Sequence, residues 1–115
     1  MNFVVKHMNS SFENETWIID AGDQVIQKMA GNSDAVLSSK ERLIYCLWVA
    51  DYCMRNAGDI SQASVMHAGW QKEAAEHSKK LVLDFCGETF LLPESSFEEQ
   101  YFSRFDGGCP KFCVY

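Results

Sequence analysis

The chain lacks the features that mark several broad classes of protein. It has only 2 prolines and 7 glycines in 115 residues, too few for a collagen-like or low-complexity chain. Its longest apolar run, Leu43–Ala50, is far shorter than the about 20 residues of a membrane-spanning helix. The first ten residues contain no apolar run of the about 7 to 15 residues that an export signal needs. We therefore predict a cytoplasmic protein with no membrane partner.

Basic residues are scarce as well. The chain has 10 Lys and Arg against 16 Asp and Glu, which leaves a formal net charge of −6. Proteins that bind nucleic-acid phosphates or anionic lipid need clustered Lys and Arg. The charge balance therefore argues against direct nucleic-acid binding and favours a basic protein as partner. The remaining composition is that of an ordinary globular protein, and the length fits one domain over residues 1–115.

The spacing of apolar residues predicts an all-α fold. They recur every three or four positions, which places them on one side of a helix. The predicted helices cover residues 12–29, 40–57, 68–85 and 94–105, with a short one through Met66 between the second and third. Strand-like alternation occurs only at Phe3–Val5. We expect a compact bundle of four to five helices.

Local signals mark the predicted helix ends. Ser38 or Ser39, with Glu41 close behind, is typical of a capped helix start. Glycine tolerates the left-handed conformation just past a helix. The predicted stops are Gly31, Gly58, Gly87 and the pair Gly107–Gly108. Thr89–Leu92 is expected to form a connector before Pro93.

Cysteine spacing does not favour a metal site. Cys46, Cys53 and Cys86 lie among apolar residues, where free cysteines are usually packed in the core. The only close pair is Cys109 and Cys113, and no second pair follows it. We therefore predict neither a metal nor another cofactor.

No catalytic motif is apparent either. His67 and His77 are ten residues apart, and neither a Gly-x-Ser-x-Gly elbow nor a glycine-rich phosphate loop is present. We predict no catalytic residues, although convergence of both histidines with a carboxylate would favour a small enzyme. Asp51 and Arg55, four apart on the second helix, indicate a structural ion pair or a polar spot in a binding face.

The acidic residues concentrate in two stretches. No basic residue lies between Lys80 and Arg104 or between Lys6 and Lys28. Each stretch is either a solvated face or a docking surface on which carboxylates steer a basic partner. The candidate partner-binding residues are Asp84, Glu88, Glu94, Glu98 and Glu99, together with Asp20 and Asp23.

Two segments resemble a family of small bacterial helical proteins related to a neisserial DNA-mimic protein. The first is ERLIYCLWVADYCMRNAGDISQA, Glu41–Ala63, in which Asn56, Gly58 and Gln62 match the family's turn. The second, FLLPESSFEEQYFSRFD at Phe90–Asp106, is similar to its closing helix. The resemblance implies an all-α fold and non-enzymatic protein binding, either as an acidic mimic of DNA or as an antidote to a toxin.

The leading hypothesis is a protein-binding inhibitor, most specifically an immunity protein (antitoxin) that neutralises a cognate bacterial toxin. A DNA-mimic regulator of a DNA-binding protein is the second hypothesis, and a small enzyme the third. Each is compatible with a homodimer formed through Trp48 or the aromatic fifth helix.

Overall fold

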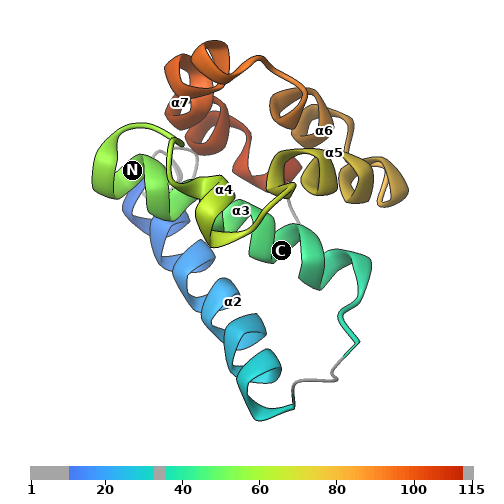
Figure 1. Ribbon diagram of the computed structural model, residues 1–115. Helices are drawn as coiled ribbons and strands as arrows, with labels where there is room; N and C mark the ends of the chain where they lie inside the picture. The colour runs from blue at the N-terminus through green and yellow to red at the C-terminus, as the bar shows by residue number, and fades with distance from the viewer. Residues whose placement is uncertain (1–10, 33–35, 113–115) are drawn as a thin grey trace, which may run out of the picture.

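The computed structural model describes residues 11–32 and 36–112, and these form six helices. The helices are α2 (Ser11–Gly31), α3 (Ser39–Ala57), α4 (Ala63–Met66), α5 (Trp70–Lys80), α6 (Asp84–Phe90) and α7 (Glu94–Phe112), shown in Figure 1. The described residues contain no strand, which confirms the predicted all-α bundle. The strand-like segment Phe3–Val5 lies outside them.

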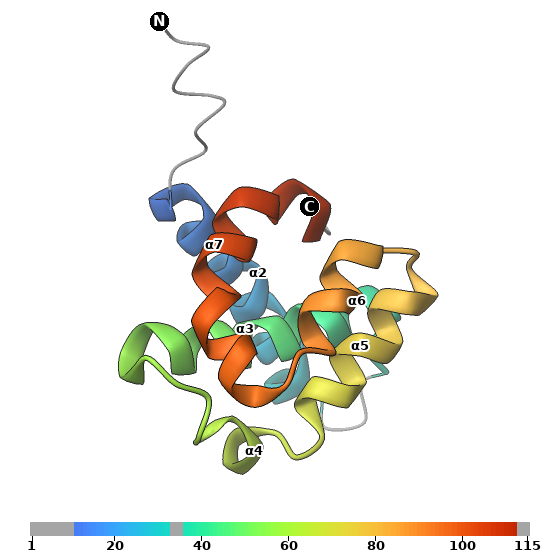
Figure 2. The ribbon, with the colours of Figure 1, turned by 90° about the horizontal axis from the view of Figure 1, so that it is seen from above.

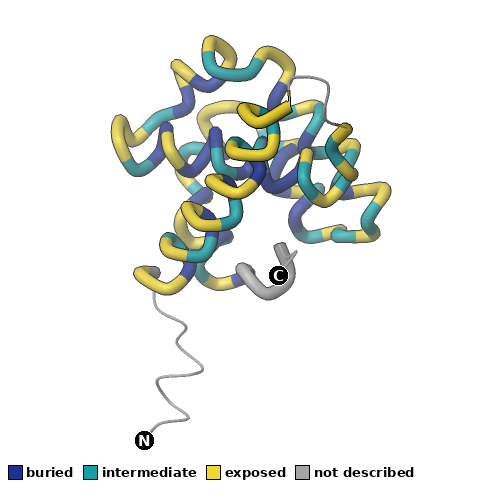
Figure 3. Tube along the Cα trace, turned by 90° about the horizontal axis from the view of Figure 1, so that it is seen from below, coloured by how far each residue is buried: buried dark blue, intermediate teal, exposed yellow. Residues whose placement is uncertain are grey.

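Helix α3 is the centre of the fold. It packs against α2 on one side and α5 on the other, as Figures 1 and 2 show. Helix α6 packs on α5, and α7 packs on α6 and returns to α2. Because α3 is apolar around most of its circumference, it can be surrounded by neighbours in this way. Buried positions accordingly face the places where the helices meet, and exposed ones face outward (Figure 3).

A row of aromatic side chains joins three of the helices. Phe97, Tyr101 and Phe105 occupy successive turns of α7 and are fully buried. Their ring centroids follow one another at 5.5 Å. Trp70 of α5 meets Phe97 edge-on at 5.6 Å, and Trp17 of α2 stacks on Phe105 at 6.4 Å. This row therefore holds α7 against both α5 and α2.

Several predicted helix ends are confirmed. Ser38 accepts the Glu41 N–H at 3.1 Å while the Glu41 carboxylate accepts the Ser38 N–H at 2.9 Å, which is a capping box. Gly58 ends α3 with a left-handed φ of 77°. Helix α2 ends at Gly31. These ends depend on local chemistry, which is why the spacing of residues predicted them.

The predicted third long helix, residues 68–85 with a stop at Gly87, is wrong. The chain instead forms α5 and α6, and Gly87 lies inside α6. Val82 takes a left-handed φ of 58°, and the Leu83 N–H bonds the Ser78 carbonyl at 2.8 Å. This six-to-one bond is that of a Schellman helix end, in which glycine usually takes the left-handed position. Since valine stands there, no sequence signal marks the break.

The predicted stop at Gly107–Gly108 is also wrong, because α7 continues to Phe112. A side chain at Gly108 would collide with the ring of Phe85 on α6. The guanidinium of Arg104 lies 5.1 Å from the centre of the same ring. Gly108 therefore serves close packing between α6 and α7 within a continuous helix.

Candidate functional site

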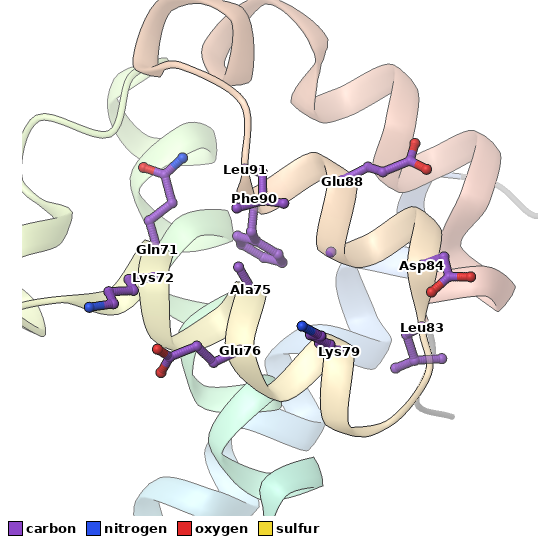
Figure 4. A pocket seen from close by; sticks show the side chains of 11 residues that line it. Gln71, Lys72, Ala75, Glu76, Lys79, Leu83, Asp84, Glu88, Phe90 and Leu91 are labelled. Atoms are coloured by element: carbon purple, nitrogen blue, oxygen red, sulfur yellow. The ribbon is translucent and has the colours of Figure 1, made fainter.

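A cleft of about 940 Å³ opens between α5 and α6. Its apolar lining comes from Ala75, Leu83, Phe90 and Leu91. Figure 4 shows the Phe90 ring between the two helices, with charged side chains around it. The break at Val82 turns α6 back against α5, so the cleft exists because the predicted single helix is divided.

The rim of the cleft carries two of the predicted partner-binding residues. Asp84 and Glu88 project from α6, and Glu76, Lys72 and Lys79 project from α5 (Figure 4). Both α6 carboxylates are exposed to solvent. Three carboxylates and two ammonium groups thus surround an apolar lining, an arrangement suited to a ligand with both apolar and charged parts.

The three acidic candidates of α7 differ in their surroundings. Glu94 and Glu99 are exposed. Glu98 is half-buried, and its carboxylate accepts the N–H of Ile60 at 3.0 Å. Glu98 therefore holds the turn that precedes α4, and the partner-binding role of these three residues stays a prediction.

Asp20 and Asp23 lie on another part of the molecule. Both are exposed on α2, where Asp23 accepts a hydrogen bond from Gln27 at 2.9 Å. Helix α3 separates α2 from α5 and α6 in Figures 1 and 2. Asp20 and Asp23 thus lie apart from Asp84 and Glu88 of α6. A DNA mimic needs carboxylates spaced along one surface like successive phosphates, and this arrangement offers that hypothesis no support.

A buried polar cluster joins α3 to α7. Asp51 is only 2% exposed, and its two carboxylate oxygens share the single N–H of the Arg55 Nε, at 2.9 and 3.1 Å. The hydroxyl of Tyr101 donates a further bond at 2.6 Å. Burial raises the pKa of Asp51, although the bonds from Tyr101 and Arg55 partly oppose that effect. Because the carboxylate is enclosed, the structural interpretation of this pair is the one that the geometry supports.

A second cluster brings together Cys46 of α3, His67 after α4 and Glu73 of α5. The His67 Nε2 lies 3.0 Å from the Glu73 Oε1, and the Cys46 thiol donates to the Glu73 Oε2 at 3.4 Å. The ligand atoms of all three residues lie within 4.8 Å of one another. Arg42 reaches the same carboxylate at 3.6 Å. This cluster could hold a metal ion, which the spacing of cysteines and histidines did not predict.

The cluster is not arranged for nucleophilic catalysis. Glu73 lies between the thiol and the imidazole, whereas a cysteine nucleophile needs the imidazole beside it. Burial and the charge of Glu73 raise the pKa of Cys46, which keeps the thiol protonated. Although burial alone would raise the pKa of Glu73, bonds from His67 and Cys46 lower it. Glu73 is thus an ionised carboxylate at neutral pH.

His77 does not join this pair. It lies one turn after Glu73 on α5, and its Nδ1 is buried with no hydrogen-bond partner among the described residues. Burial and the charge of Lys80 lower the pKa of His77. One histidine and one carboxylate converge here, rather than the two histidines that the enzyme hypothesis needs.

Glu73 lies on the inner face of α5. Its side chain is only 22% exposed and turns toward α3. Glu73 is three residues after the buried Trp70 and four before His77, so helical spacing alone puts it on the inner face. Its partners Cys46 and His67 carry no such signal, because other elements present them.

The residues considered for dimerisation largely pack against other helices of the same chain. Trp48 packs on α2, where a side chain at Gly22 would collide with its indole. The aromatic row of α7 is fully buried. The described helices include none that is both long and apolar enough to cross a membrane.

No protein-family model matches the chain, and no curated protein or solved structure compared with it matches either. The resemblance to the DNA-mimic family therefore stays a prediction.

Proposed function

We propose that this chain is a non-enzymatic inhibitor that binds a basic protein through the cleft between α5 and α6. In its most specific form, the proposal is an immunity protein that masks a bacterial toxin. The observation that carries it is the apolar cleft bordered by Asp84 and Glu88. These two carboxylates were selected from the charge pattern, and in the structure both border the cleft between α5 and α6.

The apolar part of the proposed surface extends beyond the cleft. Leu91, which lines it, is 74% exposed, and Val82, next to the lining residue Leu83, is 76% exposed. Large exposed apolar side chains favour a protein contact, because covering them removes apolar area from water. A cleft of about 940 Å³ can take several side chains of a partner.

The acidic residues of the proposed surface indicate that the partner carries positive charge. Asp84, Glu88, Glu94 and Glu99 follow one another with no basic residue between them. Such a field attracts Lys and Arg side chains and raises the rate of encounter with a basic protein. The expected partner segment therefore inserts an apolar side chain into the cleft and places basic residues against α6 and the start of α7.

The test is co-expression of the chain with the product of its adjacent gene. If the chain is an immunity protein, the neighbour is toxic alone, is neutralised by co-expression and is recovered in complex with the chain. A neighbour that is harmless, or toxic but neither bound nor neutralised, would overturn the immunity proposal.

The binding surface is tested with two matched pairs of substitutions. Asp84→Asn with Glu88→Gln should weaken binding at least about tenfold at low salt, mainly by slowing association. Asp20→Asn with Asp23→Asn removes the same charge from α2 and should leave affinity nearly unchanged. Leu91→Ser tests the apolar contribution at an exposed position. Equal effects of the two charge pairs would show that total charge matters and that the cleft does not.

A further inference from the structure

The three side chains of Cys46, His67 and Glu73 match the geometry of a small metal centre. At usual zinc bond lengths, the ligand atoms around a tetrahedral ion lie about 3.3 to 3.6 Å apart. The observed separations are 3.4 Å from the Cys46 Sγ to the Glu73 Oε2 and 3.0 Å from the His67 Nε2 to the Glu73 Oε1, and one ligand atom from each residue lies within 4.8 Å of the other two. The set is therefore close to a ligating arrangement without movement of any helix.

We propose that Cys46, His67 and Glu73 form a binding site for a divalent transition metal of the zinc class. A thiolate, an imidazole and a carboxylate form a mixed ligand set that zinc accepts. Magnesium and calcium prefer oxygen ligands alone, so the sulfur and nitrogen donors disfavour them. Three protein ligands leave a fourth position for water.

The surroundings allow an ion to enter. The side chains of His67 and Glu73 are 27% and 22% exposed, so the site is reached from solvent. Arg42, whose side chain is 45% exposed, contacts the Glu73 carboxylate and can rotate outward when a metal takes its place. The Tyr45 ring meets His67 edge-on at 5.1 Å and restrains the orientation of the imidazole.

Binding has a defined proton balance. Cys46 donates as a thiol to Glu73 when no metal is bound. On coordination, its sulfur forms the bond to the metal and its proton passes to solvent, because the ion's charge replaces that of the proton. The ion then links α3, the segment after α4 and the first turn of α5. This site is independent of the proposed cleft.

The experiment is titration of the reduced full-length chain with Co²⁺, followed by displacement with Zn²⁺. We expect a thiolate-to-cobalt charge-transfer band that disappears when zinc is added, and a higher melting temperature with either metal. His67→Gln and Glu73→Gln should each weaken binding at least about tenfold, since even the loss of a residue that only orients a metal ligand costs about 10- to 100-fold. The matched control His77→Gln, one turn away, should bind normally.

Two further variants decide between a metal site and a purely structural network. Arg42→Gln removes the cation that competes for Glu73, so it should bind Co²⁺ as tightly as the unsubstituted chain or more tightly. Cys46→Ser should abolish the charge-transfer band. A band that survives in Cys46→Ser would place the metal on other cysteines and overturn the proposal. Absence of both the band and the thermal shift in the unsubstituted chain would overturn it too.

Cys46 is buried, so its substitution could unfold the chain. Circular dichroism of each metal-free variant detects that outcome. His67→Gln and Glu73→Gln lie at partly exposed positions. If Cys46→Ser is unfolded, these two variants alone decide whether the metal site exists. If both fold and bind Co²⁺ with unchanged affinity, the site does not exist.

Discussion

Removal of a single buried hydroxyl group should measurably destabilise this fold. Tyr101→Phe deletes the donor of the 2.6 Å bond to the Asp51 carboxylate and keeps the aromatic ring. The ring still stacks on Phe97 and Phe105, both at 5.5 Å, so little packing is lost. The effect therefore reports the hydrogen bond between α7 and α3.

The magnitude follows from the burial of both partners. Tyr101 is fully buried and Asp51 is 2% exposed, so water cannot replace the lost donor. A bond to a charged group contributes about 1.5 to 3 kcal/mol. The Arg55 Nε–H is still shared between both oxygens of the carboxylate, which favours the lower half of that range. With an unfolding entropy of about 0.24 kcal/mol/K for 115 residues, the melting temperature should fall by about 6 to 9 °C.

The assay is urea unfolding followed by far-ultraviolet circular dichroism at neutral pH, with a thermal melt beside it. Tyr52→Phe is the matched control, because Tyr52 lies on α3 with 48% exposure and should change stability little. The Tyr101 hydroxyl bond favours the ionised form of Asp51, so its loss should raise the pKa of Asp51 further. The stability difference should accordingly shrink in acid. A loss below about 0.5 kcal/mol, or one equal to that of Tyr52→Phe, would refute the reasoning.

Three further outcomes can be checked by the same unfolding assay. Gly22→Ala should cost about 1 to 3 kcal/mol, because its methyl group would collide with the Trp48 indole; the gain expected for alanine in an open helix would contradict this contact. Val82→Gly should be neutral or stabilise the fold by up to about 1 kcal/mol, since it relieves a left-handed valine at an exposed position, and a clear loss would contradict that strain. Burial lowers the pKa of His77, so the unfolded chain binds more protons below about pH 6.5 and stability should fall as pH drops. That fall should be shallower in His77→Gln, and an unchanged slope would exclude this histidine as its cause.

Much of the helical pattern could be read from local chemistry. The apolar spacing of residues 40–57 predicted a central helix, and α3 is central and surrounded. The start at Ser38 and the end at Gly58 depend on hydrogen bonds and conformations within a few residues. Such signals are contained in the sequence because the atoms that make them are neighbours along the chain.

The predictions that were wrong involve contacts between distant residues. Gly108 resembles a helix stop, but the ring of Phe85 on another helix occupies the space that a side chain would fill. Just past the end of α5, Val82 adopts a left-handed conformation typical of glycine. The packing of α6 against α5 imposes this conformation. Local propensity was overridden by tertiary packing in both places.

The candidate sites also depend partly on local sequence features and partly on contacts between distant residues. Charge counting selected Asp84 and Glu88, but the cleft beside them exists only because α6 folds back on α5. It also selected Glu98, whose carboxylate is engaged with Ile60. The sequence by itself determined the all-α class, the central helix and the acidic stretches, because periodicity, capping and charge are properties of neighbouring residues. Only the tertiary structure decided which carboxylates border the cleft and that Cys46, His67 and Glu73 meet, because these depend on how separate helices pack.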